Sequence, residues 1–262
     1  MFFDCERVLY RRRQLLDVVC QLRFPTILSI ETKKPADFQE KIRASFPRYA
    51  SHEEFLQPKV TGRPGAMKVT EQAAVTNHQF LSASGDWSVN LTKDFIALTT
   101  PNYTRWEDFA AKLDQVLAAF IEVYNPAFFE RVGLRYINAF SRQALDIEDI
   151  PFNQLIQPAY LGLLGDDDVN ERSFARSTQD VEVSIPGGCR LKLHAGPGMV
   201  KKNNVEDKEV KFILDNDIFM MGNVPIAHAA AALNTVHIQA DRIFRGAITQ
   251  RLHEAMDPEP LD

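Results

Sequence analysis

Cysteine is scarce in this sequence, and long apolar runs are missing from it. The three cysteines, Cys5, Cys20 and Cys189, lie far apart, so they match neither a disulfide framework nor a zinc-ligand spacing. No apolar stretch approaches the roughly 18 residues that a membrane-spanning helix needs. At the N-terminus acidic residues precede a run of arginines, which is the wrong order for a secretory signal. We therefore expect a cytoplasmic protein with reduced thiols and no membrane contact.

A strong excess of charge of one sign is also missing. The formal net charge is −5 at pH 7. A protein that grips nucleic acid over much of its surface is usually basic, so this charge argues against such a role, although it leaves room for a local basic patch. The 262 residues are 45% hydrophobic and include 18 phenylalanines, enough for a sizeable core in one large domain or two small ones.

Catalytic signatures are missing as well. The sequence has no dinucleotide-binding fingerprint, no protein-kinase motif set and no serine in a nucleophile elbow. The segment 196–204, GPGMVKKNN, is rich in glycine and lysine but lacks the spacing of a phosphate-binding loop, so we expect a hairpin tip there. The sequence therefore indicates no cofactor and no metal site, and it leaves open whether the protein is an enzyme.

The clearest element that the sequence does contain is a strand in the middle of the chain, 129–140, FERVGLRYINAF. It follows Asn125-Pro126, which ends a helix because the residue before proline avoids the helical conformation. Its side chains alternate between two faces, as a strand requires. The apolar face holds Val132, Leu134, Tyr136 and Phe140, and the other holds Arg131, Gly133, Arg135 and Ile137.

Arg131 and Arg135 are the first candidate binding residues. On a strand they point to the same side of the sheet, where a pair of guanidinium groups is able to grip a phosphate or a carboxylate. The alternative is that they lie on a solvated face and pair with acids of neighbouring strands. With Lys201 and Lys202 of the expected hairpin tip, they form the binding set of a nucleic-acid hypothesis.

Two echoes suggest an internal duplication. The stretch 21–24 (QLRF) resembles 133–136 (GLRY), and 89–96 (VNLTKDFI) resembles 212–219 (FILDNDIF). We therefore predict an α+β fold with two related halves, residues 1–125 and 126–262. Each half is expected to be an antiparallel sheet packed by helices, and the second half to end in a long helix.

Helix signals support this division. An apolar stripe predicts a helix over 104–124, and Thr104 and Glu107 have the spacing of a capping box. A second stripe predicts a C-terminal helix of close to 30 residues, capped by Asn223, with Pro225 in its first turn and its end before Pro258.

The C-terminal helix carries the candidate catalytic chemistry. His237 and Asp241 are four residues apart, so they share a helix face. With Asp215 or Asp217 nearby they would form a metal-dependent hydrolytic cluster, although the metalloprotease helix motif is absent. The alternative is a hydrogen-bonded structural pair. We assign no catalytic residue from this pattern.

The segments 129–138 (FERVGLRYIN) and 16–24 (LDVVCQLRF) resemble those of a known protein family, as does the closing pattern His237…Ile243-Phe244…Ile248-Thr249…Leu252. It is a sporadically distributed family of bacterial and archaeal proteins of about this length, to which no function is assigned. The resemblance supplies no catalytic residue. It implies a prokaryotic gene linked to mobile elements or defence.

Our leading functional hypothesis is a non-catalytic binding or interaction protein, with a protein partner or a second copy of itself, in a defence or toxin-control system. The metal-dependent hydrolase and the nucleic-acid-binding protein are the alternatives.

Overall fold

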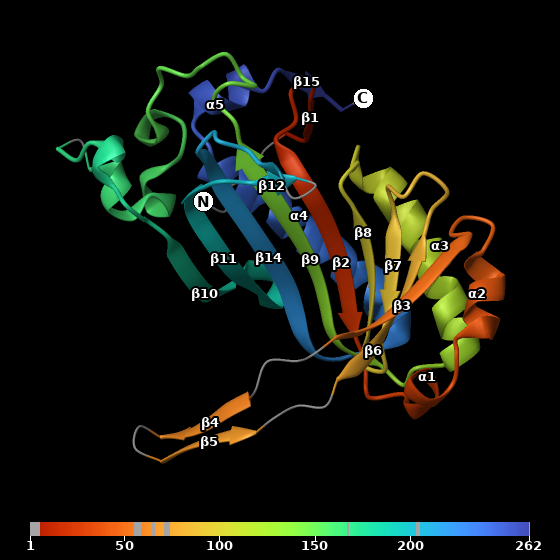
Figure 1. Ribbon diagram of the computed structural model, residues 1–262. Helices are drawn as coiled ribbons and strands as arrows, with labels where there is room; N and C mark the ends of the chain where they lie inside the picture. The colour runs from red at the N-terminus through yellow and green to blue at the C-terminus, as the bar shows by residue number, and fades with distance from the viewer. Residues whose placement is uncertain are drawn as a thin grey trace.

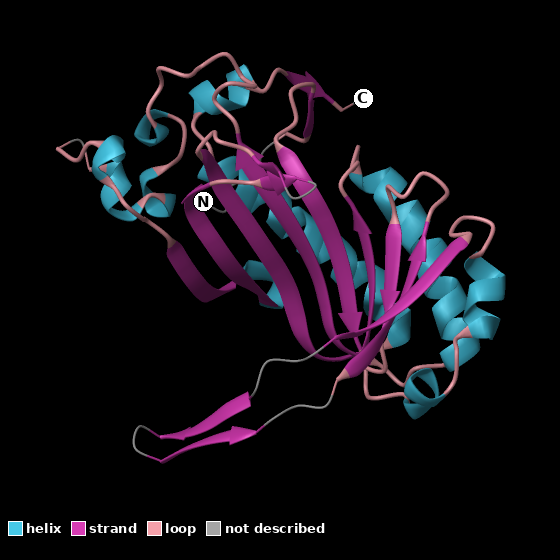
Figure 2. Ribbon diagram, viewed as in Figure 1, coloured by secondary structure: helices cyan, strands magenta, loops and turns pink. Residues whose placement is uncertain are grey.

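The computed structural model describes residues 6–54, 59–63, 66–70, 74–166, 168–202 and 205–261. Within them the chain has the expected α+β fold, with an antiparallel sheet of nine strands and long helices on one of its faces (Figures 1 and 2). The sheet strands are β2 (Leu15–Arg23), β3 (Arg48–Glu54), β6 (Val75–Leu81), β7 (Ser88–Leu91), β8 (Phe95–Thr100), β9 (Phe129–Phe140), β10 (Gln179–Ile185), β11 (Cys189–Gly198) and β14 (Lys211–Val224).

Shorter strands form small pairs outside this sheet. They are β1 (Val8–Tyr10) with β15 (Pro258–Pro260), β4 (Lys59–Arg63) with β5 (Ala66–Thr70), and β12 (Lys201–Lys202) with β13 (Val205–Glu206). The β1–β15 pair joins the two ends of the described chain, so residues that are far apart in the sequence lie side by side there (Figure 1).

The helices separate the strands into groups. They are α1 (Leu28–Thr32), α2 (Ala36–Ile42), α3 (Trp106–Tyr124), α4 (Ala229–Ala247) and α5 (Gln250–Ala255). The segment after β9 is folded mainly into short 3₁₀ turns: η1 (Phe152–Gln154), η2 (Pro158–Tyr160), η3 (Gly162–Gly165) and η4 (Glu171–Ser173). Two more, η5 (Pro186–Gly188) and η6 (Ile226–His228), precede β11 and α4. The prolines of the 147–164 stretch account for these broken pieces.

The strand order is symmetrical about the centre of the sheet. It runs β10-β11-β14-β9-β2-β8-β7-β6-β3, with β2 antiparallel to β9 in the middle. Outward from each central strand, the remaining strands follow in reverse chain order. Each group of strands is then followed by a 19-residue helix, α3 or α4. The division into related halves at residue 125 stays a prediction. The strand order allows it to be tested by superposing one half of the sheet, with its helix, on the other.

The core lies between the sheet and these helices. In β9 the apolar face predicted from the alternation is buried: Val132 and Leu134 have no exposed surface and Phe140 is 1% exposed. On α3, the stripe residues Phe109, Val116 and Phe120 are fully buried as well. The alternation therefore indicated the correct face of the central strand and the correct side of the helix.

Two helix boundaries differ from the prediction. The C-terminal helix is not continuous: α4 ends at Ala247, Ile248 is extended, and α5 begins after Thr249. The Thr249 hydroxyl accepts a hydrogen bond from the Leu252 amide and caps the second helix. Asn223 does not cap α4, because β14 and a 3₁₀ turn fill the stretch before it.

The capping box at the start of α3 is also wrong. Arg105 is the N-cap and makes no side-chain capping bond. The Thr104 hydroxyl donates to the Asp108 carboxylate instead, and Glu107 pairs with Arg7 at 2.9 Å. A contact with the distant N-terminal segment thus replaces the local cap.

Candidate functional site

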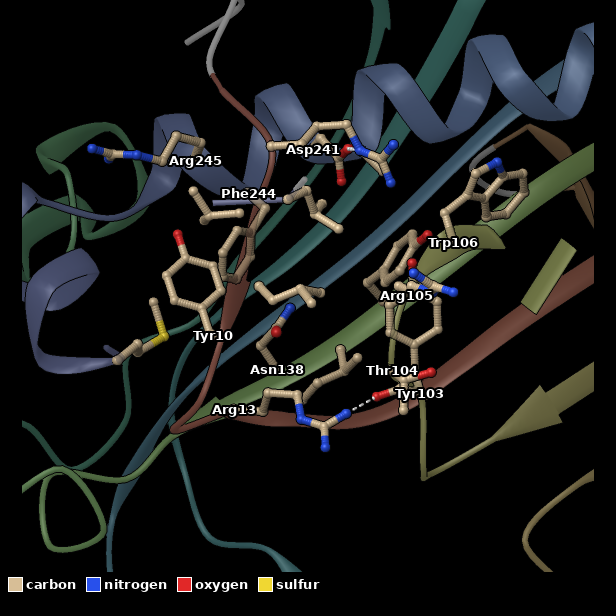
Figure 3. A pocket seen from close by; sticks show the side chains of 18 of the residues that line it. Tyr10, Arg13, Tyr103, Thr104, Arg105, Trp106, Asn138, Asp241, Phe244 and Arg245 are labelled. Carbon is tan, nitrogen blue, oxygen red and sulfur yellow. Dashed lines mark hydrogen bonds and ion pairs between the residues drawn. The ribbon is translucent and has the colours of Figure 1, made fainter. Parts of the chain in front are cut away.

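A recess lies on the helix-covered face of the sheet (Figure 3). Its base is formed by the inner strands β2, β9 and β14. The segment 6–15, the start of α3 and the second half of α4 form its sides. The cavity has a volume of about 150 Å³. Three parts of the chain that are remote in sequence thus close around one space.

Aromatic side chains make up much of the wall. In Figure 3 Tyr10 and Phe244 lie on one side of the cavity, and Tyr103 and Trp106 lie on the other. The rings of Tyr10 and Phe244 meet edge to face at 5.8 Å. Tyr103 packs against Tyr136 of β9 with ring centroids 5.7 Å apart at 90°. These contacts fix the rings, so the cavity has rigid, flat walls.

Two asparagines lie at the base of the cavity, at positions where the strands otherwise carry apolar side chains. Asn138 on β9 is 4% exposed and Asn216 on β14 is 1% exposed. The Asn138 amide donates to the Leu214 carbonyl oxygen at 3.5 Å. No described protein atom hydrogen-bonds Asn216 Oδ1. A buried carbonyl left without a donor costs about 1–3 kcal/mol, so its retention calls for a physical reason.

A chain of polar side chains crosses the wall from β9 to α4 and to the N-terminal segment. The Tyr136 hydroxyl lies 3.3 Å from His237 Nδ1, and His237 Nε2 lies 3.4 Å from Asp241 Oδ2. Asp241 in turn lies 3.7 Å from Arg7, which pairs with Glu107 of α3. His237 and Asp241 therefore do share a helix face, as their spacing predicts, and that face looks into the cavity.

Burial shifts both titratable groups of this pair. The imidazole of His237 stacks on Trp106 with ring centroids 4.4 Å apart, and burial, aided by Arg7, lowers the pKa of His237 to about 4. Burial raises the pKa of Asp241 to about 6, while Arg7 opposes the rise and Glu107 adds to it. The Asp241 side chain is 38% exposed, so part of it still contacts solvent. At neutral pH the pair is a neutral imidazole beside a carboxylate.

Arginines lie around the cavity: Arg7, Arg13, Arg105 and Arg245. Arg7 and Arg105 have acidic partners. Arg13 donates to the Tyr103 carbonyl oxygen, and Arg245 donates to the Gln250 amide oxygen at 2.7 Å. Both of those partners are neutral, and among the described residues no carboxylate forms an ion pair with either side chain.

The predicted binding arginines lie on the opposite face of the sheet and are engaged there. Arg135 donates to both oxygens of Asp215, at 2.7 and 2.5 Å, and Arg131 lies 2.5 Å from Asp217. The Arg131 guanidinium also covers the ring of Phe219 at 4.4 Å. Both ion pairs run diagonally between the two strands, because Asp217 lies opposite Arg135, Asp215 opposite Ile137 and Met221 opposite Arg131. The alternative in which they pair with acids of a neighbouring strand is the observed arrangement.

The two lysines of the binding set lie elsewhere. Lys201 and Lys202 form β12, where Lys201 is exposed and lies opposite Glu206 of β13. Asn203 and Asn204, the other end of the predicted hairpin tip, lie outside the described residues. The structure does not place the lysines and the arginine pair in one shared cavity.

The four residues of the hydrolase alternative are not brought together. Asp215 and Asp217 face the helix-free side of β14 and bind arginines, whereas His237 and Asp241 face the cavity from α4. Alternation along β14 places odd-numbered residues on the side away from the helices. In the described part of the chain, no group of three or more histidine, cysteine, aspartate or glutamate side chains is arranged to hold a metal ion. The cluster as hypothesised is therefore wrong.

The arginine-rich N-terminal segment is folded against the rest of the protein. Besides Arg7 and Arg13, Arg11 pairs with Asp257 and Glu259, and Arg12 pairs with Asp146 at 2.6 Å. Cys20 and Cys189 are free and buried, and Cys5 lies outside the described residues. Within the described residues, no helix combines the length and apolarity needed to cross a membrane.

Neither a protein-family model nor a curated protein matches this chain. The resemblance noted from the strand motifs therefore stays a prediction, and the functional argument depends on the cavity itself. Sequence reasoning singled out His237 and Asp241 but missed Asn138 and Asn216. Their signal is visible in the sequence: each is a polar residue at an apolar position of an alternating strand.

Proposed function

We propose that this protein is a non-catalytic binding protein that takes up a small organic molecule in the aromatic cavity. The observation that carries this proposal is the recess itself, which has aromatic walls and two buried asparagines, Asn138 and Asn216, at its base. Apolar walls with a few convergent polar groups are the usual composition of a small-molecule site.

The remaining chemistry supports binding over catalysis. A general base needs to reach its substrate proton, and His237 Nε2 is buried without a hydrogen-bond partner among the described residues, while the ring stacks on Trp106 and Nδ1 faces the Tyr136 hydroxyl. Burial raises the pKa of Tyr136 well above its ordinary value, so that phenol is protonated at neutral pH. The groups around the cavity are thus held in place by each other and serve to position a ligand.

Filling the cavity tests the proposal. Ala240 of α4 lines it and is 4% exposed. In a thermal-shift screen of one- and two-ring aromatic fragments, we expect the unmodified protein to give hits with raised Tm, because a ligand that binds only the folded state stabilises it. Ala240→Phe is expected to abolish those shifts, with Ala240→Leu as a milder version if the larger side chain lowers stability.

The matched control is Ala230→Phe, on the exposed side of the same helix. It should keep every hit. A screen without hits on the folded protein, or hits that survive in both Ala240 variants, would contradict the cavity as the binding site.

A protein partner is a second candidate, favoured by one edge of the sheet. β10 is the outer strand on its side, and Val181 and Val183 of β10 are 40% and 44% exposed. An edge strand with exposed apolar residues is a template for pairing with another strand. Native mass spectrometry that shows only monomer, for both the original chain and Val183→Lys, would argue against this partner.

A cytoplasmic location and a defence-linked prokaryotic role belong to the same proposal, supported by the free buried cysteines and by the family resemblance.

A further inference from the structure

We propose that β3 is a dimer interface of this protein: it pairs with β3 of a second copy of the chain, antiparallel about a two-fold axis at Ser51, so that the sheet continues from one subunit into the other. The inference does not rest on the cavity, because β3 is the outer strand at one edge of the sheet and the cavity lies over inner strands. An open edge, a two-fold register and the order of the charges along β3 carry it.

The edge of the sheet at β3 is open. Within the described residues β3 pairs with β6 alone, and every residue of β3 except Glu54 is exposed. An outer strand presents unpaired N–H and C=O groups, which are a template for a further strand. Charged side chains commonly block such an edge, so their order along β3 decides whether a second copy is excluded or accepted.

Symmetry limits the register in which two β3 strands pair. In a two-fold dimer both subunits use the same patch, and two antiparallel strands of one sheet are then related by an axis perpendicular to that sheet. Residues directly opposite each other lie on the same side of the sheet, so their positions differ by an even number. The complete overlap of Arg48–Glu54 has its axis at Ser51. Moving the axis to Ala50 or His52 shortens the overlap and separates Arg48 from the partner's Glu54.

In the register centred on Ser51, no two like charges lie opposite each other. Arg48 lies opposite the partner's Glu54, Tyr49 opposite the partner's Glu53, and Ala50 opposite the partner's His52. Opposite charges directly across a strand pair stabilise it. The two-fold axis repeats the contact between arginine and glutamate at both ends of the overlap.

Both members of this contact have capacity for it. Arg48 is exposed, and among the described residues no side chain pairs with it. Glu54 accepts a hydrogen bond from Asn77 at 2.5 Å and lies 3.3 Å from His52, and its side chain is 39% exposed. An ionised carboxylate has about four acceptor positions, so it has room for a guanidinium as well.

The other outer strand, β10, gives the opposite result. Its complete self-overlap has the axis at Glu182, which places that carboxylate opposite the partner's Glu182. Like charges directly opposite each other destabilise a strand pair. Asp180 lies opposite the partner's Ser184, so no cation of the partner strand offsets the repulsion. A second copy therefore fits the edge at β3 and not the edge at β10.

Cysteine cross-linking tests the register. On mild oxidation Ser51→Cys is expected to form a disulfide-linked dimer, because directly opposed residues have Cβ atoms about 4.5–5.5 Å apart. Glu53→Cys is the matched control on the same strand: its two copies lie about 13 Å apart along the strands and should stay unlinked. The original chain, oxidised in parallel, measures any background on the non-reducing gel, since Cys20 and Cys189 are buried and Cys5 lies outside the described residues.

Charge exchange tests the contact itself. Arg48→Glu and Glu54→Arg are each expected to raise the dissociation constant of the dimer by about tenfold, because each places like charges together at both ends of the overlap. The double variant exchanges the two charges and should return the dissociation constant to within about threefold of the original value. Sedimentation velocity over a range of protein concentrations measures these constants. Val183→Lys, a change on β10, is the control and should leave the dimer unchanged.

Four outcomes would overturn the inference. They are a chain that stays monomeric at every concentration, a Ser51→Cys variant that cross-links no more than Glu53→Cys, a dimer that Val183→Lys abolishes, and a double variant no stronger than the single ones. None of them affects the binding of fragments in the cavity, so failure at β3 leaves the proposed function standing.

Discussion

Replacing Leu134 with alanine is expected to lower the free energy of unfolding by about 2–5 kcal/mol, the range for a large-to-small change in a core that does not collapse around the cavity. Leu134 lies in the middle of β9 with no exposed surface. Its neighbours across the sheet are Cys20 on β2 and Ile218 on β14, which are buried completely as well. With strands on both sides and helices above, little can move into the space.

Urea denaturation followed by circular dichroism measures this effect as a lower midpoint with an unchanged slope. Val183→Ala is the control, since Val183 lies on the edge strand and is 44% exposed; its change should stay within about 0.5 kcal/mol. If the two variants were equally stable, the pair β2–β9 would not be the centre of the core.

That centre is also the part of the fold that the sequence predicted best. β9 begins and ends at the residues expected from the alternation, Phe129 and Phe140, and it pairs with β2. Each of these two strands has a neighbouring strand on both sides, so one complete face is buried. The alternation of side chains with a two-residue period is therefore clear in the sequence of these strands. Asn125 ends α3 in the left-handed conformation with φ 44°, immediately before Pro126, where the local signal had placed the stop.

The C-terminal helix shows why local signals fail. Its apolar stripe continues past Ile248, yet the backbone leaves the helix there. Hydrogen bonds with a distant segment replace the helical ones. The backbone N–H of Gln157 donates to the Ala247 carbonyl oxygen at 2.8 Å, and the backbone N–H of Thr249 donates to the Leu155 carbonyl oxygen at 2.9 Å. Ile248 bridges to Ile156. Periodicity reports which side of a segment is buried, and it is silent about such long-range competition.

The site was predicted in part for the same reason. The spacing of His237 and Asp241 placed them on one helix face, which is a local property. Their neighbours are not local: Arg7 arrives from the N-terminal segment and Tyr136 from the central strand. Likewise, pairing of Arg135 with Asp215 depends on the register of β9 and β14, which no single segment specifies. The two asparagines at the cavity base are the exception: each interrupts the apolar side of an alternating strand, which is visible in the sequence alone.

A cluster of buried charged side chains lies at the end of the central strand, and removing one of its charges is expected to lower the stability of the protein. Glu209, in the loop before β14, accepts hydrogen bonds from the Ser141 hydroxyl at 2.6 Å and from the Gln143 amide at 3.0 Å. It also lies 3.0 Å from Lys211, and the two side chains are only 10% and 12% exposed. The cluster therefore fastens the start of β14 to the turn that follows β9.

Glu209→Gln is expected to lower the free energy of unfolding by about 2–4 kcal/mol. Removing one member of a buried pair leaves the other charge uncompensated, which typically costs about 3–5 kcal/mol. The expected loss is somewhat smaller because Asp207 still contacts Lys211. Asp207→Asn is the matched control: Asp207 is 48% exposed, so its contribution should stay below about 1 kcal/mol. Equal losses in the two variants would contradict the role assigned to Glu209.

The pH dependence of the stability difference shows whether Glu209→Gln acts through the lost charge or through altered packing. Burial alone would raise the pKa of Glu209, but its bonds to Ser141, Gln143 and Lys211 outweigh burial and lower the pKa. A carboxylate with a lowered pKa in the folded state stabilises the fold above the ordinary glutamate pKa, about 4.3, and that contribution is lost as the pH falls through the lowered value. The stability difference between the original protein and Glu209→Gln should therefore be largest near neutral pH and shrink in acid. A difference that stays constant from pH 7 to pH 3 would mean that the substitution acts through packing, and that the charge of Glu209 contributes little to holding β14 beside β9.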